Sequence, residues 1–260
     1  MMKIIKNNYQ IILYVLLIVG MLVIDRLNIE WSKNELASSM IENSILRFAG
    51  GVIFLVILIS YGYGNLFKFN APVKALVIII PAFIVAINNF PISAYLNGRT
   101  EVIEPVHNIY LFLLESFSVG FFEEIIFRGM ILMLLLGKLQ NKSHGVLKAI
   151  IISSLIFGFV HLFNIIQGAS YGNTMLQIGY SFLMGLLFAV LYLRTKNIWL
   201  IMILHALYNF FGQVMFQVGE VSNRYDAITI NVTVIIGIGC AVYSVFLYIQ
   251  IKDKVIFDLE

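Results

Sequence analysis

Long, uninterrupted apolar runs constrain the fold of this 260-residue chain more than any other feature. A helix needs about 20 predominantly apolar residues to cross the hydrocarbon core of a bilayer. Eight segments have this character, namely 9–24, 44–63, 75–96, 106–137, 148–166, 174–193, 197–217 and 228–251. Membrane β-strands are disfavoured because they are shorter and alternate in hydrophobicity. The sequence therefore predicts an all-α, polytopic membrane protein with about eight transmembrane helices.

The composition agrees with a membrane protein and excludes several other classes. Hydrophobic residues make up 60% of the chain and charged residues 12%, whereas a soluble domain carries about 25% charged residues. The net charge of +3 fits basic loops beside anionic lipid better than nucleic-acid binding. A single cysteine, Cys240, excludes a disulfide framework, a Cys-rich metal site and a redox pair. We expect Cys240 to be an inert packing residue.

Lysine and arginine are distributed unequally between alternate connections, which predicts the orientation. The first apolar run follows Lys3 and Lys6, as in a signal peptide, but lacks a small-residue cleavage site, so we expect an uncleaved helix. With the N-terminus in the cytoplasm, the inner side carries Lys3, Lys6, Lys68, Lys74, Lys138, Lys142, Lys148, Arg194, Lys196, Lys252 and Lys254. The outer side carries Arg26, Lys33, Arg99 and Arg224. The count predicts that both termini are cytoplasmic and that the protein lies in the cell membrane.

The segment 106–137 is too long for one straight span. As a helix it would extend about 48 Å across a hydrocarbon core of about 30 Å. Irregular backbone at membrane depth is tolerated only where protein or water surrounds it. We therefore expect this segment to tilt, protrude or break, with a break at its polar residues.

Ionisable side chains inside the spans are few, and their positions define a candidate site. They are Arg47, Glu115, Glu123, Glu124, Arg128, His161 and His205. A charge at mid-bilayer costs on the order of 3 kcal/mol, so a buried cluster indicates a function. Counting about 1.5 Å per residue places Glu123, Arg128, His161, His205 and Asn209 about 12 to 21 Å from the inner boundary. Residues at a shared depth on three helices predict one protein-lined cavity.

Spacing suggests a role for each residue of this cluster. Glu124 and Arg128 are four residues apart, with the acid first, which favours an ion pair on one helix. Glu123 is rotated by about 100° from Glu124 and is free to face the cavity and take a proton from water. His205 and Asn209 share a helix face, so both could donate to a developing oxyanion. The remaining histidine, His161, could hold the same water.

Structural explanations compete with these roles. The two histidines and Asn209 could be polar contacts between helices, and Glu123 could pair with a neighbouring helix. We expect Glu115 to be an interfacial or packing residue, and Arg47 to extend to the outer interface.

The polar residues fall into three short motifs. In order, they are Glu123-Glu124-xxx-Arg128, Phe157-xxx-His161 and His205-xxx-Asn209. This order and spacing resemble the CPBP family of intramembrane proteases, also called the CAAX-protease or Abi family. The resemblance covers about 106–217. It divides the chain into N-terminal helices (1–105), a catalytic core (106–217) and a C-terminal helix with its tail (218–260).

The resemblance implies a role for each motif residue. Glu123 would activate water, His161 would help to bind that water, and His205 with Asn209 would form the oxyanion site. The implied supporting residues are Glu124 and Arg128. Eukaryotic relatives remove the last three residues of prenylated CAAX proteins, whereas bacterial relatives are linked to bacteriocin immunity, peptide maturation and membrane signalling. The resemblance therefore leaves the substrate open.

The resulting prediction is an intramembrane endopeptidase that hydrolyses a peptide or membrane-protein substrate in the lipid bilayer without a cofactor. A zinc-dependent version is an alternative, because Glu123, His161 and His205 match a zinc ligand set in number and type. A second alternative is a non-enzymatic bacteriocin-immunity or membrane scaffold protein. A third is a small transporter with a proton-relay carboxylate, which the absence of paired half-helix motifs disfavours.

The orientation also predicts how substrate reaches the site. Because His205 lies about 12 Å from the cytoplasmic boundary, we expect entry from the cytoplasm or the inner leaflet. Ile201 and Leu135 would then lie near the mouth, and the outer surface would be closed.

Overall fold

Polar capping residues fix where several helices begin. The structure is a computed structural model that describes residues 30–69, 72–166 and 168–251. The side chains of Asn34, Ser170, Asn197 and Asp226 each accept a hydrogen bond from a backbone N–H three residues further on. Such caps satisfy backbone donors that a helix leaves unpaired at its start. The cap at Asn34 explains why the first described helix begins well before residue 44, where the apolar run predicted it.

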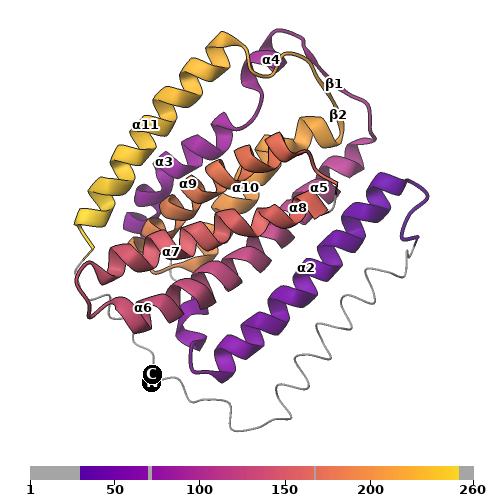
Figure 1. The fold of residues 1–260 in the computed structure, drawn as a ribbon. Coiled ribbons are helices and arrows are strands. Elements are labelled where there is room, and N and C mark those ends of the chain that lie inside the picture. The colour runs from indigo at the N-terminus through magenta and orange to yellow at the C-terminus, as the bar shows by residue number, and fades with distance from the viewer. Residues whose placement is uncertain (1–29, 70–71, 167, 252–260) are drawn as a thin grey trace.

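The described chain is a bundle of helices (Figure 1). Its α-helices are α2 (Glu35–Ser60), α3 (Val73–Asn88), α4 (Ile92–Leu96), α5 (Val106–Glu124), α6 (Met133–Leu139), α7 (Gly145–Phe159), α8 (Phe163–Ile166), α9 (Tyr171–Thr195), α10 (Ile198–Gln217) and α11 (Ala227–Ile249). Two 3₁₀ turns, η1 (Gly64–Phe67) and η3 (Val160–Leu162), and one π-helix, η2 (Ile125–Leu132), join them.

The all-α, polytopic architecture is confirmed. Within the described residues, five stretches are long and apolar enough to cross a membrane: α2, residues Gly145–Ile166, α9, α10 and α11. The predicted span 75–96 is shorter, because α3 ends at Asn88 and Pro91 precedes α4. The predicted span 9–24 lies outside the described residues. The number of eight spans and the cytoplasmic placement of both termini stay predictions.

The long segment 106–137 is interrupted, as its length requires. Helix α5 ends at Glu124, the π-helix η2 follows, and α6 resumes at Met133. A π-helix accommodates extra backbone per turn and is frequent at functional sites. The interruption begins directly after Glu123 and Glu124 and contains Arg128, so it lies at the polar residues, as predicted.

A two-stranded antiparallel sheet at one end of the bundle was not predicted. Strand β1 (Thr100–Val102) pairs with β2 (Gly219–Val221), with Glu101 opposite Glu220. A side chain at Gly219 would overlap the carbonyl oxygen of Glu101, so the close pairing requires glycine there. The sheet joins the connection after α4 to the connection after α10, which are far apart in the sequence.

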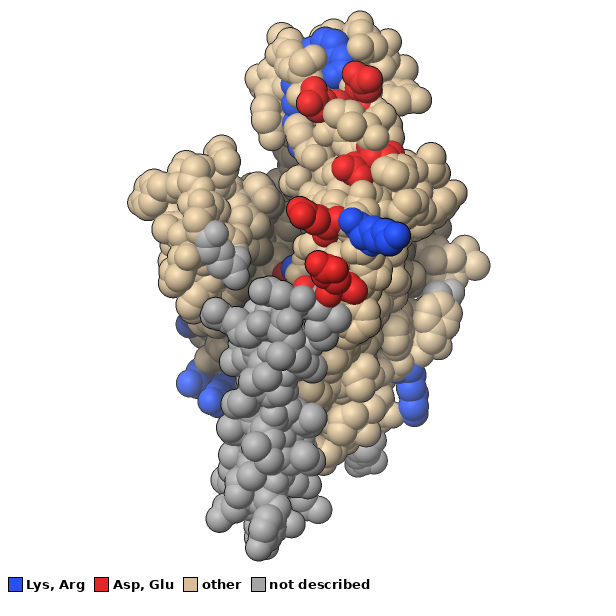
Figure 2. Space-filling model, turned by 90° about the vertical axis from the view of Figure 1, so that its right-hand side faces the viewer, with Lys and Arg blue, Asp and Glu red and all other residues tan. Residues whose placement is uncertain are grey.

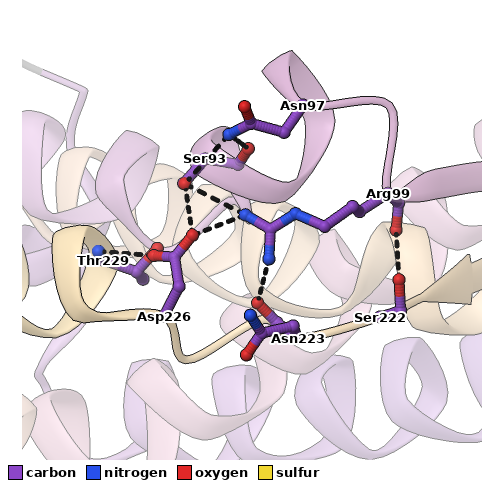
Figure 3. Close-up of polar contacts among 7 residues, drawn as sticks. All are labelled: Ser93, Asn97, Arg99, Ser222, Asn223, Asp226 and Thr229. Carbon is purple, nitrogen blue, oxygen red and sulfur yellow. Dashed lines mark hydrogen bonds and ion pairs between the residues drawn. The ribbon is translucent and has the colours of Figure 1, made fainter.

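A cluster of polar side chains beside this sheet holds the start of α11 in place through hydrogen bonds (Figure 3). Arg99 and Ser93 both donate to the carboxylate of Asp226, which also caps α11 at Thr229. Hydrogen bonds from Ser93, the Thr229 backbone and Arg99 hold the pKa of Asp226 well below its usual range. Because an unfolded Asp titrates near about 3.9, the stabilisation is present above that pH and is lost only as the pH falls through the lowered folded value.

Helix α10 is the central element that positions the site, since it packs against α5, α3 and α9. It approaches α5 closely at Gly120, where an added Cβ would lie 2.6 Å from the carbonyl oxygen of Met202 and 3.5 Å from the Cβ of His205. The absence of a side chain at Gly120 therefore sets the distance between the helices that carry Glu123 and His205.

We predict that Gly120→Ala destabilises the protein by about 1–3 kcal/mol, because the methyl group forces two backbones apart. It should also lower activity by moving His205 relative to Glu123. Thermal unfolding of the purified protein in detergent measures the first effect. Gly137→Ala on α6 is the control, since nothing lies within 4 Å of its added Cβ, and it should be neutral or slightly stabilising. Equal stability of both variants would contradict the close contact.

Candidate active site

Residues from all three motifs line one cavity of about 310 Å³. Its walls come from α5, α7 with η3 and α8, α9 and α10, and Arg47 of α2 closes one side. Glu123, His161, His205 and Asn209 all line it. The structure thus brings together the four residues that the sequence proposes as catalytic, as the shared depth predicted.

Glu124 lies behind this wall and is fully buried. Its Oε1 accepts a hydrogen bond from Nη1 of Arg128 at 2.8 Å, which is the predicted ion pair. The same oxygen lies 2.7 Å from Nδ1 of His205. Within the described part of the chain, Oε2 of Glu124 has no hydrogen-bond partner. Glu124 therefore connects the arginine to a cavity-lining histidine, a contact that sequence spacing did not predict.

The bond to Glu124 fixes the ring of His205. With Nδ1 bonded to a carboxylate, the proton is assigned to Nδ1, and Nε2 becomes the atom available to the cavity. Nε2 lies 3.7 Å from Oε2 of Glu123. A neutral ring held in this way accepts at Nε2, so donation to an oxyanion requires the imidazolium form.

Two phenylalanines hold the charged groups in place. The Phe157 ring lies 5.7 Å from the His161 ring and 5.8 Å from the His205 ring, and Phe188 lies 5.6 Å from His205. The guanidinium of Arg128 lies over both phenylalanines, at 4.8 Å and 5.5 Å, where cation–π attraction offsets part of its desolvation. Sequence reasoning missed Phe188, since nothing distinguishes it among the phenylalanines of an apolar span.

The expectation that Arg47 extends to the outer interface is wrong. Its Nη1 donates to Oε1 of Glu115 at 3.1 Å, and both residues line the cavity. The pair joins α2 to α5, which explains how Glu115 is accommodated inside a span. The two residues are 68 positions apart, so no sequence periodicity links them.

The prediction of an inner mouth near Ile201 and Leu135 is also wrong. Ile201 is 0% exposed, and Leu135 packs against the hydrophobic core. That core occupies the half of the bundle where α6 ends and α7 and α10 begin. The cavity instead extends from Glu123 towards the opposite ends of the same helices, where Gln177 and Gln213 line it.

Cys240 is a free thiol on α11 that packs against the core and does not line this cavity. Its position agrees with the expected packing role.

Comparison with known proteins shows what this chain is similar to. Residues 105–211 match the model of the family described as "Type II CAAX prenyl endopeptidase Rce1-like". The chain is also 34% identical over 149 residues to the Bacillus subtilis (strain 168) protein named "Putative membrane peptidase YdiL". That alignment covers 57% of this chain and 54% of the relative, so the chain spans about half of the relative's length. No solved structure matches the chain.

The matched region contains all three motifs and all the residues that line the polar cavity except Arg47 of α2 and Gln213 of α10. The chain is thus a multi-pass membrane protein with a helical core that is similar to membrane peptidases. Residues 105–211 are similar to the CPBP, or CAAX protease, family.

Proposed function

We propose that the protein is an intramembrane endopeptidase of the cell membrane that hydrolyses a peptide bond of a membrane-associated protein or peptide. The observation that carries this proposal is the convergence of Glu123, His161, His205 and Asn209 on one cavity among apolar helices. The family match over residues 105–211 and the membrane-peptidase relative support the same reaction.

In the proposed reaction, Glu123 is the general base. Its side chain is 23% exposed, so water can reach the carboxylate, and His161 faces the same cavity and holds that water. Glu123 takes one proton as the water oxygen bonds to the carbonyl carbon. The proton is then given to the departing amide nitrogen as the carbon–nitrogen bond breaks. No covalent intermediate with the enzyme forms.

The negative charge that develops on the carbonyl oxygen needs hydrogen-bond donors. Asn209 and the imidazolium form of His205 supply them from adjacent turns of α10. Glu124 supports this role because its carboxylate fixes the ring through Nδ1 and stabilises the charged imidazolium. Arg128 balances the carboxylate from the side away from the cavity.

We predict that Asn209→Ala lowers kcat by about 10²–10³-fold, as removal of one oxyanion donor typically does. The fold should be unaffected, because Asn209 is half-buried on the cavity wall. Turnover by purified protein measures the effect, and Asn231→Ala, on an exposed face of α11, is the control. Full activity of the Asn209 variant would remove it from the oxyanion site.

A zinc-dependent reaction is the alternative within the same enzyme class. Among the described residues, no group of three or more His, Cys, Asp or Glu side chains is arranged to hold a metal ion. The bond from Nδ1 of His205 to Glu124 leaves Nε2 free, and this arrangement suits either a neutral base or a metal ligand, so a chelator must decide between the two reactions. We predict that a membrane-permeant zinc chelator leaves turnover unchanged. Inhibition that added zinc reverses would establish the metal-dependent alternative.

The proposal is tested by comparing membrane peptides from cells that carry the native protein with those from cells that carry Glu123→Gln. Uncleaved substrates should accumulate in the variant, and their new termini in native cells should identify the cleaved bond. Glu220→Gln, an exposed acid on β2, is the matched control and should resemble the native protein. Identical peptide populations in all three strains would contradict the proposed protease function.

The non-enzymatic alternative, an immunity or scaffold protein, makes a different prediction. Any bacteriocin protection that the protein confers would survive Glu123→Ala if the polar cluster were only structural, and would be lost if hydrolysis is required.

A further inference from the structure

The proposed reaction uses only the deep part of the cavity, so its other half needs an explanation. Phe112, Ser116, Val119 and Glu123 all line the cavity and recur every three or four residues along α5. They therefore form one face of that helix. From Glu123 to Ser116 this face extends about 10 Å at about 1.5 Å per residue. The cavity is thus long enough to hold several residues of a substrate.

Ser116 is the unusual residue on this face. It is 2% exposed, and its Oγ has no hydrogen-bond partner within the described part of the chain. Other buried serines on α5 and α7 behave differently, since Ser118, Ser153 and Ser154 each donate to a backbone carbonyl three or four residues earlier. A buried hydroxyl without a partner is costly, so its place beside a cavity indicates that a ligand supplies the missing bond.

The walls around Ser116 suit the backbone of an extended peptide. Ser181 on α9 is buried and lines the same cavity, and Gln213 on α10 lines it further out. An unpaired peptide backbone offers alternating N–H and C=O groups and needs partners for them in a buried site. An extended strand advances about 3.3 Å per residue. A distance of about 10 Å therefore places Ser116 beside the third residue from the bond that Glu123 attacks.

The direction of the cavity determines the end of the bundle from which this peptide arrives. The half of the bundle where α6 ends and α7 and α10 begin is filled by core residues that include Leu132, Ile150 and Ile201. The open half points to the end of the bundle that carries β1 and β2, which we call the acidic end. In the described chain, its acidic residues are Glu30, Glu35, Glu42, Glu101, Glu104, Glu220 and Asp226, and its basic residues are Lys33, Arg99 and Arg224.

The opposite end has the reverse character. Its charged residues in the described chain are all basic, namely Lys68, Lys74, Lys138, Lys142, Lys148, Arg194 and Lys196. Figure 2 shows acidic side chains gathered on the upper half of the face that carries α2, and only basic ones near the lower edges. Basic ends of membrane helices lie in the cytoplasm. The cavity therefore opens on the side away from the cytoplasm.

We propose that the outer half of the cavity is a substrate-binding subsite, in which Ser116 hydrogen-bonds the backbone of an extended peptide segment that enters from the acidic end. This inference rests on the proposed protease function. It assigns the substrate to peptides or protein segments that are accessible from the exterior face of the membrane, and it makes Ser116 a positioning residue that does not take part in bond cleavage.

The first experiment is kinetic and uses the full-length protein in liposomes. Its probe is a fluorogenic copy of the peptide that accumulates in Glu123→Gln cells. Ser116→Ala should raise KM about 3- to 10-fold with little change in kcat, since one hydrogen bond to bound substrate is lost. Ser116→Thr should restore the native KM. The midpoint of thermal unfolding should stay equal or rise in Ser116→Ala, because a buried hydroxyl without a partner is removed. Ser118→Ala is the matched control.

A native KM in Ser116→Ala would overturn the subsite. A lower unfolding midpoint together with a lower kcat would show that Ser116 supports the fold, and this result would also overturn the proposed subsite. If the native protein cleaves nothing, the proposed function fails, and the second experiment decides the inference by itself.

The second experiment measures access without activity. In a Cys240→Ser background, Ser116→Cys is treated with a membrane-impermeant thiol reagent in intact cells and in inside-out vesicles. Two exposed positions mark the sides, Ser222→Cys at the acidic end and Lys142→Cys at the basic end. Ser116→Cys should react in the preparation that labels Ser222→Cys, and much faster than the matched Ser118→Cys. Labelling that follows Lys142→Cys, or no labelling at all, would overturn the inference.

Discussion

Replacing Glu123 with glutamine is expected to lower the rate of peptide hydrolysis by about 10²–10⁴-fold, which is the usual contribution of a positioned general base. The amide is nearly the same size as the carboxylate but cannot take the proton from water. The side chain is partly exposed to the cavity and forms no ion pair with an arginine in the described chain. Neutralising it therefore leaves no buried charge without a partner, and the variant should fold normally.

Single-turnover hydrolysis in liposomes measures this effect, and yield and thermal unfolding show whether the fold is kept. Glu115→Gln is a demanding control, since Glu115 lines the same cavity but pairs with Arg47. It should keep most of the chemical step. Turnover by the Glu123 variant within tenfold of native would mean that another group activates the water.

Replacing Arg128 with alanine is expected to have the largest effect on stability, a loss of about 3–5 kcal/mol. Both partners of the pair are almost completely buried, at 3% and 0% side-chain exposure, so the variant strands the carboxylate of Glu124. It also removes the cation from over Phe157 and Phe188. Folded yield and the midpoint of thermal unfolding should both fall.

Adding Glu124→Gln to the Arg128 variant should recover part of this stability, because no unpaired charge then remains. Activity should not recover, since the neutral amide holds His205 less strongly and cannot stabilise its charged form. Arg47→Ala is the comparison, because its pair with Glu115 is 34% and 12% exposed and solvent screens it more. If both arginine variants lost the same stability, burial would not be what makes the Glu124 pair important.

Features within one helix were predictable from the sequence. The i, i+4 spacing of Glu124 and Arg128 yields an ion pair in any regular helix, and shared depth placed Glu123, His161 and His205 near one another. Length predicted that the segment 106–137 would tilt, protrude or break, and its polar residues predicted the place of the break. Each of these predictions needs only the rise and pitch of a helix and the thickness of a bilayer.

Contacts between helices were not predictable in the same way. The bond from Glu124 to His205 and the pair between Arg47 and Glu115 depend on how helices rotate and approach, which no single helix encodes. The close crossing at Gly120 likewise becomes visible only when α10 is in place. The cavity was predicted to open at the wrong end because depth counting locates side chains along a helix but cannot show which half of a bundle is filled by core packing.

The filled half of the bundle has a consequence for the cell. A hydrolase inside a membrane must bring water to its substrate, yet a continuous aqueous path would dissipate ion and proton gradients. Here the hydrophobic core around Leu132, Ile150 and Ile201 closes the polar cavity at one end. Water can reach the carboxylate from one face while apolar side chains keep the other face sealed. Substitutions that introduce polar groups into this core would therefore let ions or protons cross the membrane and would harm the cell, whatever their effect on catalysis.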